Sequence, residues 1–273
     1  MYKTENTDPR FAAIRQPRNI WAIPAIHAET ERLMALHDGL YSRIRPGDRI
    51  VYHGNYTGYG PQAVDTVNEI LAFRRSVMAL PGMMADDIVY LRGSQEELWE
   101  KLLQIPFARN PIDVLRWMLD NGIAPTLASY GINPRDGLLA AHEGITALTR
   151  WVAKIRAAIR RHPGHEMFTA HWRRAAYTAS DNSAPLLFVH AGIDPARTLQ
   201  EQGDSFWWAG KNFNDITAAY DPFAKVIRGY DPGHGGLHLN CVIATIDAGC
   251  GFGGQLVGAG ITPRGEVFDL LET

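Results

Sequence analysis

The first ninety residues alternate between short apolar runs and longer amphipathic segments. The runs at 20–25, 49–52 and 87–91 have the length and apolar content of buried strands. The segments between them, 29–43 and 64–80, carry apolar residues three or four positions apart, as a helix with one buried face does. Neighbouring parallel strands need a crossover connection, which is usually a helix. The alternation therefore predicts a parallel α/β core with helices packed on the sheet.

The rest of the chain divides into two parts. From about 95 to 182 it is rich in helical periodicity, which predicts a helical insert. After Pro185, short strand-like runs alternate with clusters of Gly, Pro and Asp, at 186–189, 225–228, 239–246, 255–261 and 266–271. The last two runs predict an antiparallel hairpin across 262–265. Two sheets packed face to face, with helices outside, are the expected architecture.

The polar stretch 1–18 predicts a loosely held lead-in, which leaves 19–273 as one expected domain. The chain has 273 residues, a length that α/β folds often reach as a single unit. The start has no apolar signal core, and no run reaches the roughly 18 apolar residues of a membrane span. We therefore expect a cytoplasmic protein that does not bind membranes.

The composition limits which kinds of partner and compartment the protein is expected to have. The chain is 46% hydrophobic and 21% charged, which is typical of a globular protein with a substantial core. Its formal net charge is −2, so it has no basic excess with which to bind nucleic acid. Its two cysteines, Cys241 and Cys250, are too few for a disulfide framework and favour a reducing compartment.

Five loops follow the predicted strands at their carboxyl ends. Ligands of α/β sheets bind at this edge, so these loops are the candidate site. They are 24–28, 54–61, 93–96, 190–192 and 229–232.

The order and spacing of these loops resemble the phosphoprotein phosphatase branch of the calcineurin-like metallophosphoesterases. That branch includes Ser/Thr protein phosphatases and bacterial dinucleoside tetraphosphatases. The resemblance covers the chain from about residue 19 to the end, apart from the region between about 100 and 182. It rests on scaffold segments at 45–48, 54, 60–61, 93, 96, 188–192 and 246–254. It implies an α/β protein with a four-layer α/β/β/α sandwich.

The positions that carry the family's chemistry differ in the first two loops. The family has Gly-Asp-x-His-Gly in the first loop, so its metal-binding Asp is Ala25 here and only His27 remains. In the second loop the metal-bridging Asp is Asn55, and the next Asp is Gly58. The Arg that grips phosphate in the family is Tyr59.

The later loops differ as well. The family's metal-binding Asn and proton-donating His correspond to Ser94 and Gln95. His190 remains as a ligand, whereas Tyr230 replaces the His of the late Gly-His-Thr motif. The family's second phosphate-contacting Arg follows a Trp by two positions, and Gly210 stands there after Trp208.

These replacements predict a site without the family's metal pair. The family mechanism uses two divalent cations about 3.5–4 Å apart, and carboxylates are needed to offset their charge. Tyr59 and Gly210 cannot form bidentate contacts to phosphate, and Gln95 cannot act as a general acid. We therefore expect no cofactor, or at most one weakly bound Mn, Fe or Zn ion. The vestigial candidate ligands are His27, Asn55 and His190.

Other residues near these loops have more than one interpretation. His53, His234 or Asp231 could rebuild a metal site, or each could be an ordinary loop residue. Glu96 and Asp247 are expected to hold loops and turns, and Cys250 to be packed rather than reactive. An aromatic recognition cleft could be formed by Tyr59, Trp207, Trp208 and Tyr230, although the two tryptophans could equally lie in the core.

Three functional hypotheses follow. The first is a catalytically inactive pseudophosphatase that binds an unidentified protein or small molecule. The alternative is a metal-dependent phosphoesterase with a remodelled, mononuclear site, acting on phosphoproteins or dinucleoside polyphosphates. A third possibility is a structural subunit whose cleft is filled by side chains such as Tyr59 and Tyr230.

Overall fold

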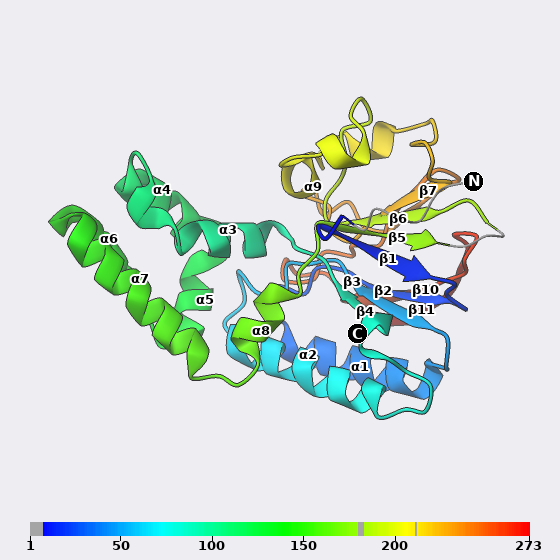
Figure 1. The fold of residues 1–273 in the computed structure, drawn as a ribbon, viewed down its shortest axis with the longest axis horizontal. Helices are drawn as coiled ribbons and strands as arrows, with labels where there is room; N and C mark the ends of the chain where they lie inside the picture. The colour runs from blue at the N-terminus through cyan, green and yellow to red at the C-terminus, as the bar shows by residue number, and fades with distance from the viewer. Residues whose placement is uncertain (1–7, 180–182, 211) are drawn as a thin grey trace.

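The computed structural model describes residues 8–179, 183–210 and 212–273. Two mixed β-sheets lie face to face with helices on their outer faces, which confirms the expected fold class (Figure 1). The five-stranded sheet has the order β11-β10-β2-β3-β4, and the six-stranded sheet has the order β1-β5-β6-β7-β9-β8. Within the described residues, no helix combines the length and apolar character needed to cross a bilayer.

The five-stranded sheet is built from the predicted strand–helix alternation. Its strands β2, β3 and β4 pair in parallel. Helices α1 and α2, which connect them along the chain, pack on one face of the sheet. The carboxyl-terminal hairpin adds two antiparallel strands beside β2, as the sequence predicts. The bounds are β2 (Ile20–Ile23), α1 (Thr30–Arg43), β3 (Arg49–Tyr52), α2 (Ala63–Met78), β4 (Ile88–Tyr90), β10 (Val257–Ile261) and β11 (Val267–Glu272).

Strand β2 shows how the two cores are separated. Successive side chains of a strand point to opposite faces. Trp21 and Ile23 face helices α1 and α2, whereas Ile20 and Ala22 enter the core between the two sheets. Both faces are covered, so all four residues are buried, as is usual for parallel strands.

The six-stranded sheet faces the first one through a second set of apolar residues, including Phe188 and Ile227. Its other face is covered by loops and short helices that contribute Phe206, Trp207 and Phe213. The bounds are β1 (Phe11–Arg15), β5 (Ala175–Ala179), β6 (Leu186–Val189), α9 (Ser205–Trp208), β7 (Lys225–Arg228), β8 (His238–Leu239) and β9 (Ile243–Thr245).

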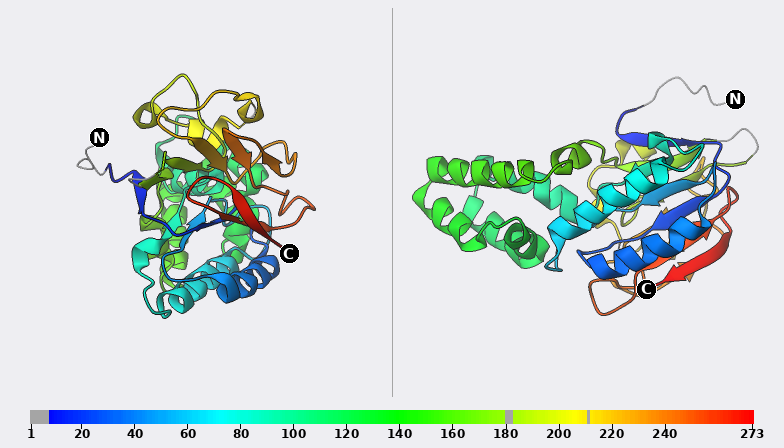
Figure 2. Two further views of the ribbon diagram at one scale, coloured as in Figure 1. Left: turned by 90° about the vertical axis from the view of Figure 1, so that its right-hand side faces the viewer. Right: turned by 90° about the horizontal axis from the view of Figure 1, so that it is seen from below.

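The helical insert protrudes from the sandwich as an arm (Figure 2). It has its own core, in which Leu115, Leu148 and Trp151 are buried. Gly137 allows α6 to lie against α7, because a Cβ there would come within 2.5 Å of the Trp151 ring. The bounds are α3 (Ser94–Leu102), α4 (Pro111–Met118), α5 (Ala124–Ser129), α6 (Pro134–Glu143), α7 (Ile145–Arg160) and α8 (His165–Ala170).

Three sequence expectations need correction. The lead-in predicted for 1–18 contains strand β1, which pairs in parallel with β5, while residues 1–7 lie outside the described part. The helical insert predicted for about 95–182 ends before strand β5 (Ala175–Ala179). Both strands are rich in alanine, which gives a weak strand signal. The single strand predicted at 239–246 is two strands, because Asn240 accepts backbone N–H groups from Val242 and Ile243 and turns the chain.

Candidate functional site

The five loops meet at one edge of the two sheets. The Ala25 N–H donates to the Gly229 carbonyl at 2.9 Å, and the His27 N–H donates to the Asn55 carbonyl at 2.9 Å. His190 joins the second loop because its Nδ1–H donates to the His53 carbonyl at 2.7 Å. The structure therefore brings the positions singled out from the sequence into one place.

Glu96 holds the second and third loops together. Its carboxylate accepts N–H groups from Asn55 at 2.7 Å, Gly93 at 2.9 Å and Tyr56 at 3.0 Å. Burial raises the pKa of this carboxyl to about 7, while the N–H donors act in the opposite direction. These contacts agree with the expected structural role of Glu96.

Two buried aspartates hold the later loops in the same way. Asp247 accepts the N–H groups of Asp231 and Gly249, both at 2.8 Å, which is the turn-capping role expected for it. Asp231 accepts the N–H groups of Gly233 and Gly235 and forms an ion pair with the buried Arg228 at 3.1 Å. The carboxylate of Asp231 is therefore occupied by contacts within its own loop and with Arg228, which argues against a role as a replacement metal ligand.

Asn55 satisfies its amide within the protein. Its Oδ1 accepts hydrogen bonds from the Ser94 hydroxyl at 3.0 Å and from the Gln95 N–H at 2.9 Å. Its Nδ2 donates to His27 Nε2 at 3.4 Å. The amide and hydroxyl at the family's metal-ligand positions thus bind each other.

Aromatic rings pack on the two remaining histidines. Tyr230 stacks on His190 with ring centroids 5.0 Å apart and also contacts the edge of His27. Tyr59 and Phe252 pack edge-on against His27, at 5.4 and 5.0 Å. Burial lowers the pKa of both imidazoles to about 3, so they are neutral at physiological pH.

His53 resembles His190 in its hydrogen bonding. Its Nδ1–H donates to the Val189 carbonyl at 2.7 Å, and burial lowers its pKa to about 4. The Nε2 atoms of His53 and His190 are both buried without a hydrogen-bond partner. His234 takes a different position, because it stacks on Phe252 and lies 3.8 Å from Asp247.

The insert is fastened to the loops at two positions where the family has catalytic residues. The Gly58 N–H donates to Thr126 Oγ1 at 3.1 Å, and a Cβ on Gly58 would lie 2.4 Å from the Gln95 side chain. Gln95 in turn donates to the Asn121 carbonyl at 2.9 Å and lies against Gly122. Residues that would serve chemistry in the family therefore join the arm to the sandwich here.

The two tryptophans differ in role. Trp207 is buried and donates its indole N–H to the Arg92 carbonyl at 2.9 Å, so it belongs to the core. Trp208 is 44% exposed and contacts Trp117 of the arm. Gly210 lies where a Cβ would come within 2.6 Å of Pro232, which leaves no room for a side chain without a shift of the loop.

Cys250 is packed, as expected. Its thiol is buried and donates to the Ile26 carbonyl at 3.3 Å. Burial raises its pKa to about 12, so the reactive thiolate is scarce at physiological pH.

The dinuclear metal centre implied by the resemblance does not fit these donors. In the described part of the chain, no three His, Cys, Asp or Glu side chains are grouped so as to hold a metal ion. The carboxylates nearby bind backbone N–H groups, and burial raises the pKa of the Tyr230 phenol, which disfavours a phenolate ligand. Two neutral imidazoles and one amide supply no anion to offset two divalent cations.

Comparison with known proteins supports the fold assignment. No protein-family profile matches the sequence, and no curated protein matches it. A solved structure described as a diadenosine tetraphosphatase matches with a TM-score of 0.56 and 15% identity, over 96% of this chain and 97% of that chain. A protein serine/threonine phosphatase from Saccharomyces cerevisiae matches with a TM-score of 0.52 and 12% identity, over 97% and 83%.

A mutant cold-active protein tyrosine phosphatase matches with a TM-score of 0.50 and 11% identity, over 97% of this chain and 85% of that chain. The chain is thus structurally similar to calcineurin-like metallophosphoesterases. At these identities the likeness establishes the fold and not the activity.

Sequence reasoning missed Phe252, Asn121 and Thr126. Phe252 is a large aromatic residue within a glycine-rich run, and that contrast is a signal for a residue facing a site. Asn121 and Thr126 lie in the insert, where the sequence gives no sign of contact with the loops.

Proposed function

We propose that this protein is a catalytically inactive pseudophosphatase that uses the metallophosphoesterase fold for binding or regulation. The observation that carries the proposal is the state of the family's metal-ligand positions. Ala25 offers no donor, and Asn55 and Ser94 bind each other. Tyr230 stacks on His190, so an uncharged aromatic group lies where the family has a metal ligand.

The electrostatic argument supports the same conclusion. Two divalent cations near each other repel strongly in a buried site unless anions lie between them. The nearest carboxylates, Glu96, Asp231 and Asp247, each accept backbone N–H groups, and turning any of them toward a metal would break those hydrogen bonds. A metal-activated hydroxide therefore lacks a place to form.

The proposal is tested by metal content and turnover measured on the same preparation. Purified protein should contain no stoichiometric Mn, Fe or Zn. It should not hydrolyse aryl phosphates or dinucleoside tetraphosphates, with or without added Mn²⁺. The His190→Ala variant is the matched control, because a contaminating phosphatase would be unaffected by it. Turnover that His190→Ala abolishes would overturn the proposal.

One observation favours a second candidate, a hydrolase with a mononuclear site. The buried Nε2 atoms of His53 and His190 carry lone pairs without partners, and such atoms are potential metal ligands. Two nitrogen donors fall short of the three protein ligands usual in catalytic zinc sites. Protein purified without added metal should carry one ion per chain if this candidate is correct, and both His53→Ala and His190→Ala should remove it.

A further inference from the structure

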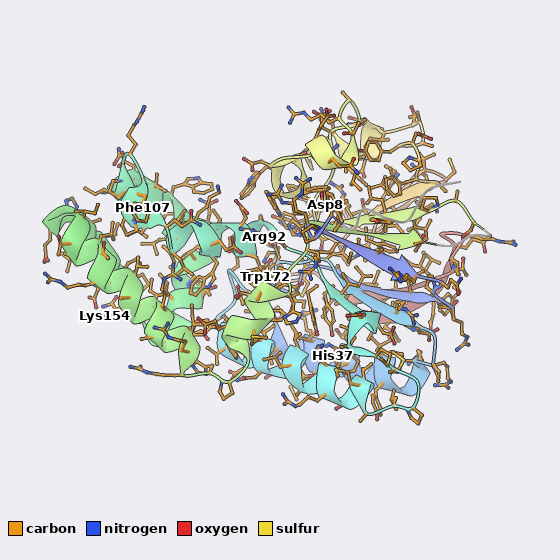
Figure 3. The ribbon with its side chains drawn as sticks, in the orientation of Figure 1. Asp8, His37, Arg92, Phe107, Lys154 and Trp172 are labelled. Carbon is orange, nitrogen blue, oxygen red and sulfur yellow. The ribbon has the colours of Figure 1, made fainter. Side chains whose placement is uncertain are left out.

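Two surfaces of opposite charge lie far apart on this chain. The first is the exposed face of helix α7 on the arm, and the second is a groove beside the six-stranded sheet. Figure 3 shows Lys154 on the arm and Asp8, which lines the groove, on the sandwich. The chain as a whole is close to neutral, with a formal net charge of −2.

The exposed face of helix α7 is basic. Helix α7 and the residue after it carry five cations and no acidic residue: Arg150, Lys154, Arg156, Arg160 and Arg161. All five are exposed, and none forms an ion pair with another described residue. Arg156 alone donates to a backbone carbonyl, that of Leu103. At about 100° per residue, Arg150, Lys154 and Arg161 form one row.

The groove has the complementary charge. It has a volume of about 2360 Å³, which exceeds that of most small-molecule pockets. Its walls carry the exposed carboxylates Asp204, Asp215 and Asp221, which form no ion pair among the described residues. It also contains Arg15 and two carboxylates that already form ion pairs, Asp194 with Arg197 and Asp8 with Arg10.

An aromatic ring adds a second kind of contact for a cation. Trp208 lines the groove and is 44% exposed. Guanidinium groups bind over tryptophan faces as well as to carboxylates. A row of arginines and lysines laid along the groove would therefore meet both kinds of partner.

From this charge complementarity we propose that the groove of one copy receives the basic face of helix α7 from a second copy. The contact is heterologous, since two different surfaces meet, and it generates rings or open chains of protomers. The proposal concerns association only, so it stands or falls independently of whether the former catalytic loops are active.

The test is the oligomeric state of the full chain by sedimentation velocity at low and high salt. In about 20 mM salt, exposed charges interact over roughly 20 Å, and in about 0.5 M salt over roughly 4 Å. The sedimentation coefficient should rise with protein concentration at low salt and return to that of a monomer at high salt. A monomer at low salt, even at high protein concentration, would overturn the proposal.

Charge reversal assigns the surfaces. Arg150→Glu with Lys154→Glu should weaken association at least tenfold, and Asp204→Lys with Asp215→Lys should do the same. Arg75→Glu with Arg264→Glu is the control for net charge, because both residues are exposed and lie away from either surface. Circular dichroism confirms that each variant is folded.

A variant that combines the charge reversals on helix α7 and in the groove provides the decisive test. It should restore association to within a few-fold of the unmodified chain, because the two charges have been exchanged. Association that survives the arm reversal excludes α7 as the contact. Association that depends on α7 but is unaffected by the groove reversal excludes the groove and overturns the proposal as well.

Discussion

Two parts of the strand-end loops differ in chemistry. We call the buried carboxylates that hold the loops in shape the backs, and the positions of the family's metal and phosphate ligands the tips. At the backs, Glu96, Asp231 and Asp247 are buried carboxylates, and each accepts at least two backbone N–H groups. At the tips, where the family holds metal and phosphate, the residues are uncharged and largely aromatic. The comparison shows that these loops keep their shape through groups other than the metal ligands, so the fold can persist without the metal.

The largest expected effect on the free energy of unfolding comes from removing a carboxylate at the backs. Glu96→Ala leaves three buried N–H groups without an acceptor, at about 1–3 kcal/mol each. We expect the free energy of unfolding in urea to fall by about 4 kcal/mol. Glu100→Ala, one helical turn further along α3, removes only a partly exposed ion pair and should cost less than about 1 kcal/mol. Equal losses for the two variants would contradict the difference between backs and surface.

The buried histidines make the tips sensitive to acid. The pKa values of His27, His53 and His190 are lowered by burial to about 3, 4 and 3. Below about pH 6.5 the unfolded chain takes up protons on these imidazoles and the folded protein does not, so stability falls as the pH falls. Glu96 acts in the opposite direction, because its raised pKa of about 7 favours proton uptake by the folded state.

Together these four groups are expected to lower the free energy of unfolding by about 3 kcal/mol between pH 7 and 5. His37 and His165, whose pKa values burial also lowers, add to this loss. Unfolding in urea at a series of pH values measures it. His190→Gln should reduce the number of protons taken up on unfolding by about one at pH 5, and an unchanged proton uptake would show that His190 is not neutral in the folded protein.

A substitution where the tips contact the arm is expected to have a smaller effect on the free energy of unfolding. Gly58→Asp, which restores the family's residue, forces a Cβ to within 2.4 Å of the Gln95 side chain at a backbone φ of 89°. We expect a loss of about 2–3 kcal/mol in unfolding free energy. Gly131→Asp is the matched control, since its φ is 73° and nothing lies within 4 Å of its Cβ position. Its loss should be about 1 kcal/mol.

The smallest effect is expected at the exposed rim of the tips. Tyr59 is 37% exposed, and its ring packs against His27 and Phe252. Tyr59→Arg should change the unfolding free energy by less than about 1 kcal/mol. It should also leave inorganic phosphate binding undetectable by calorimetry, because one guanidinium without a metal or a second arginine makes a weak anion site. Measurable phosphate binding by this variant would show that the tips remain a phosphate site that lacks only the arginine at position 59.

The sequence predicts the sandwich well for physical reasons. The run at 186–189 is apolar throughout and coincides with β6, and the run at 49–52 is apolar after Arg49 and coincides with β3. The strands it misses, Phe11–Arg15 and Ala175–Ala179, are rich in alanine, which has no strong preference for strands.

The candidate site could be predicted only in part. The resemblance places His27, Asn55 and His190 at one edge, and backbone hydrogen bonds join their loops there. The packing of Phe252 on His27 and the contact of Gln95 with the insert could not be foreseen, because both join segments more than twenty residues apart in the sequence.

The account depends most directly on whether the neutral tips can hold two divalent cations. Electron paramagnetic resonance of the protein after equilibration with Mn²⁺ and gel filtration answers this question. We predict no signal from an exchange-coupled Mn²⁺ pair. A coupled pair at two ions per chain, removed by His190→Ala, would contradict the central claim.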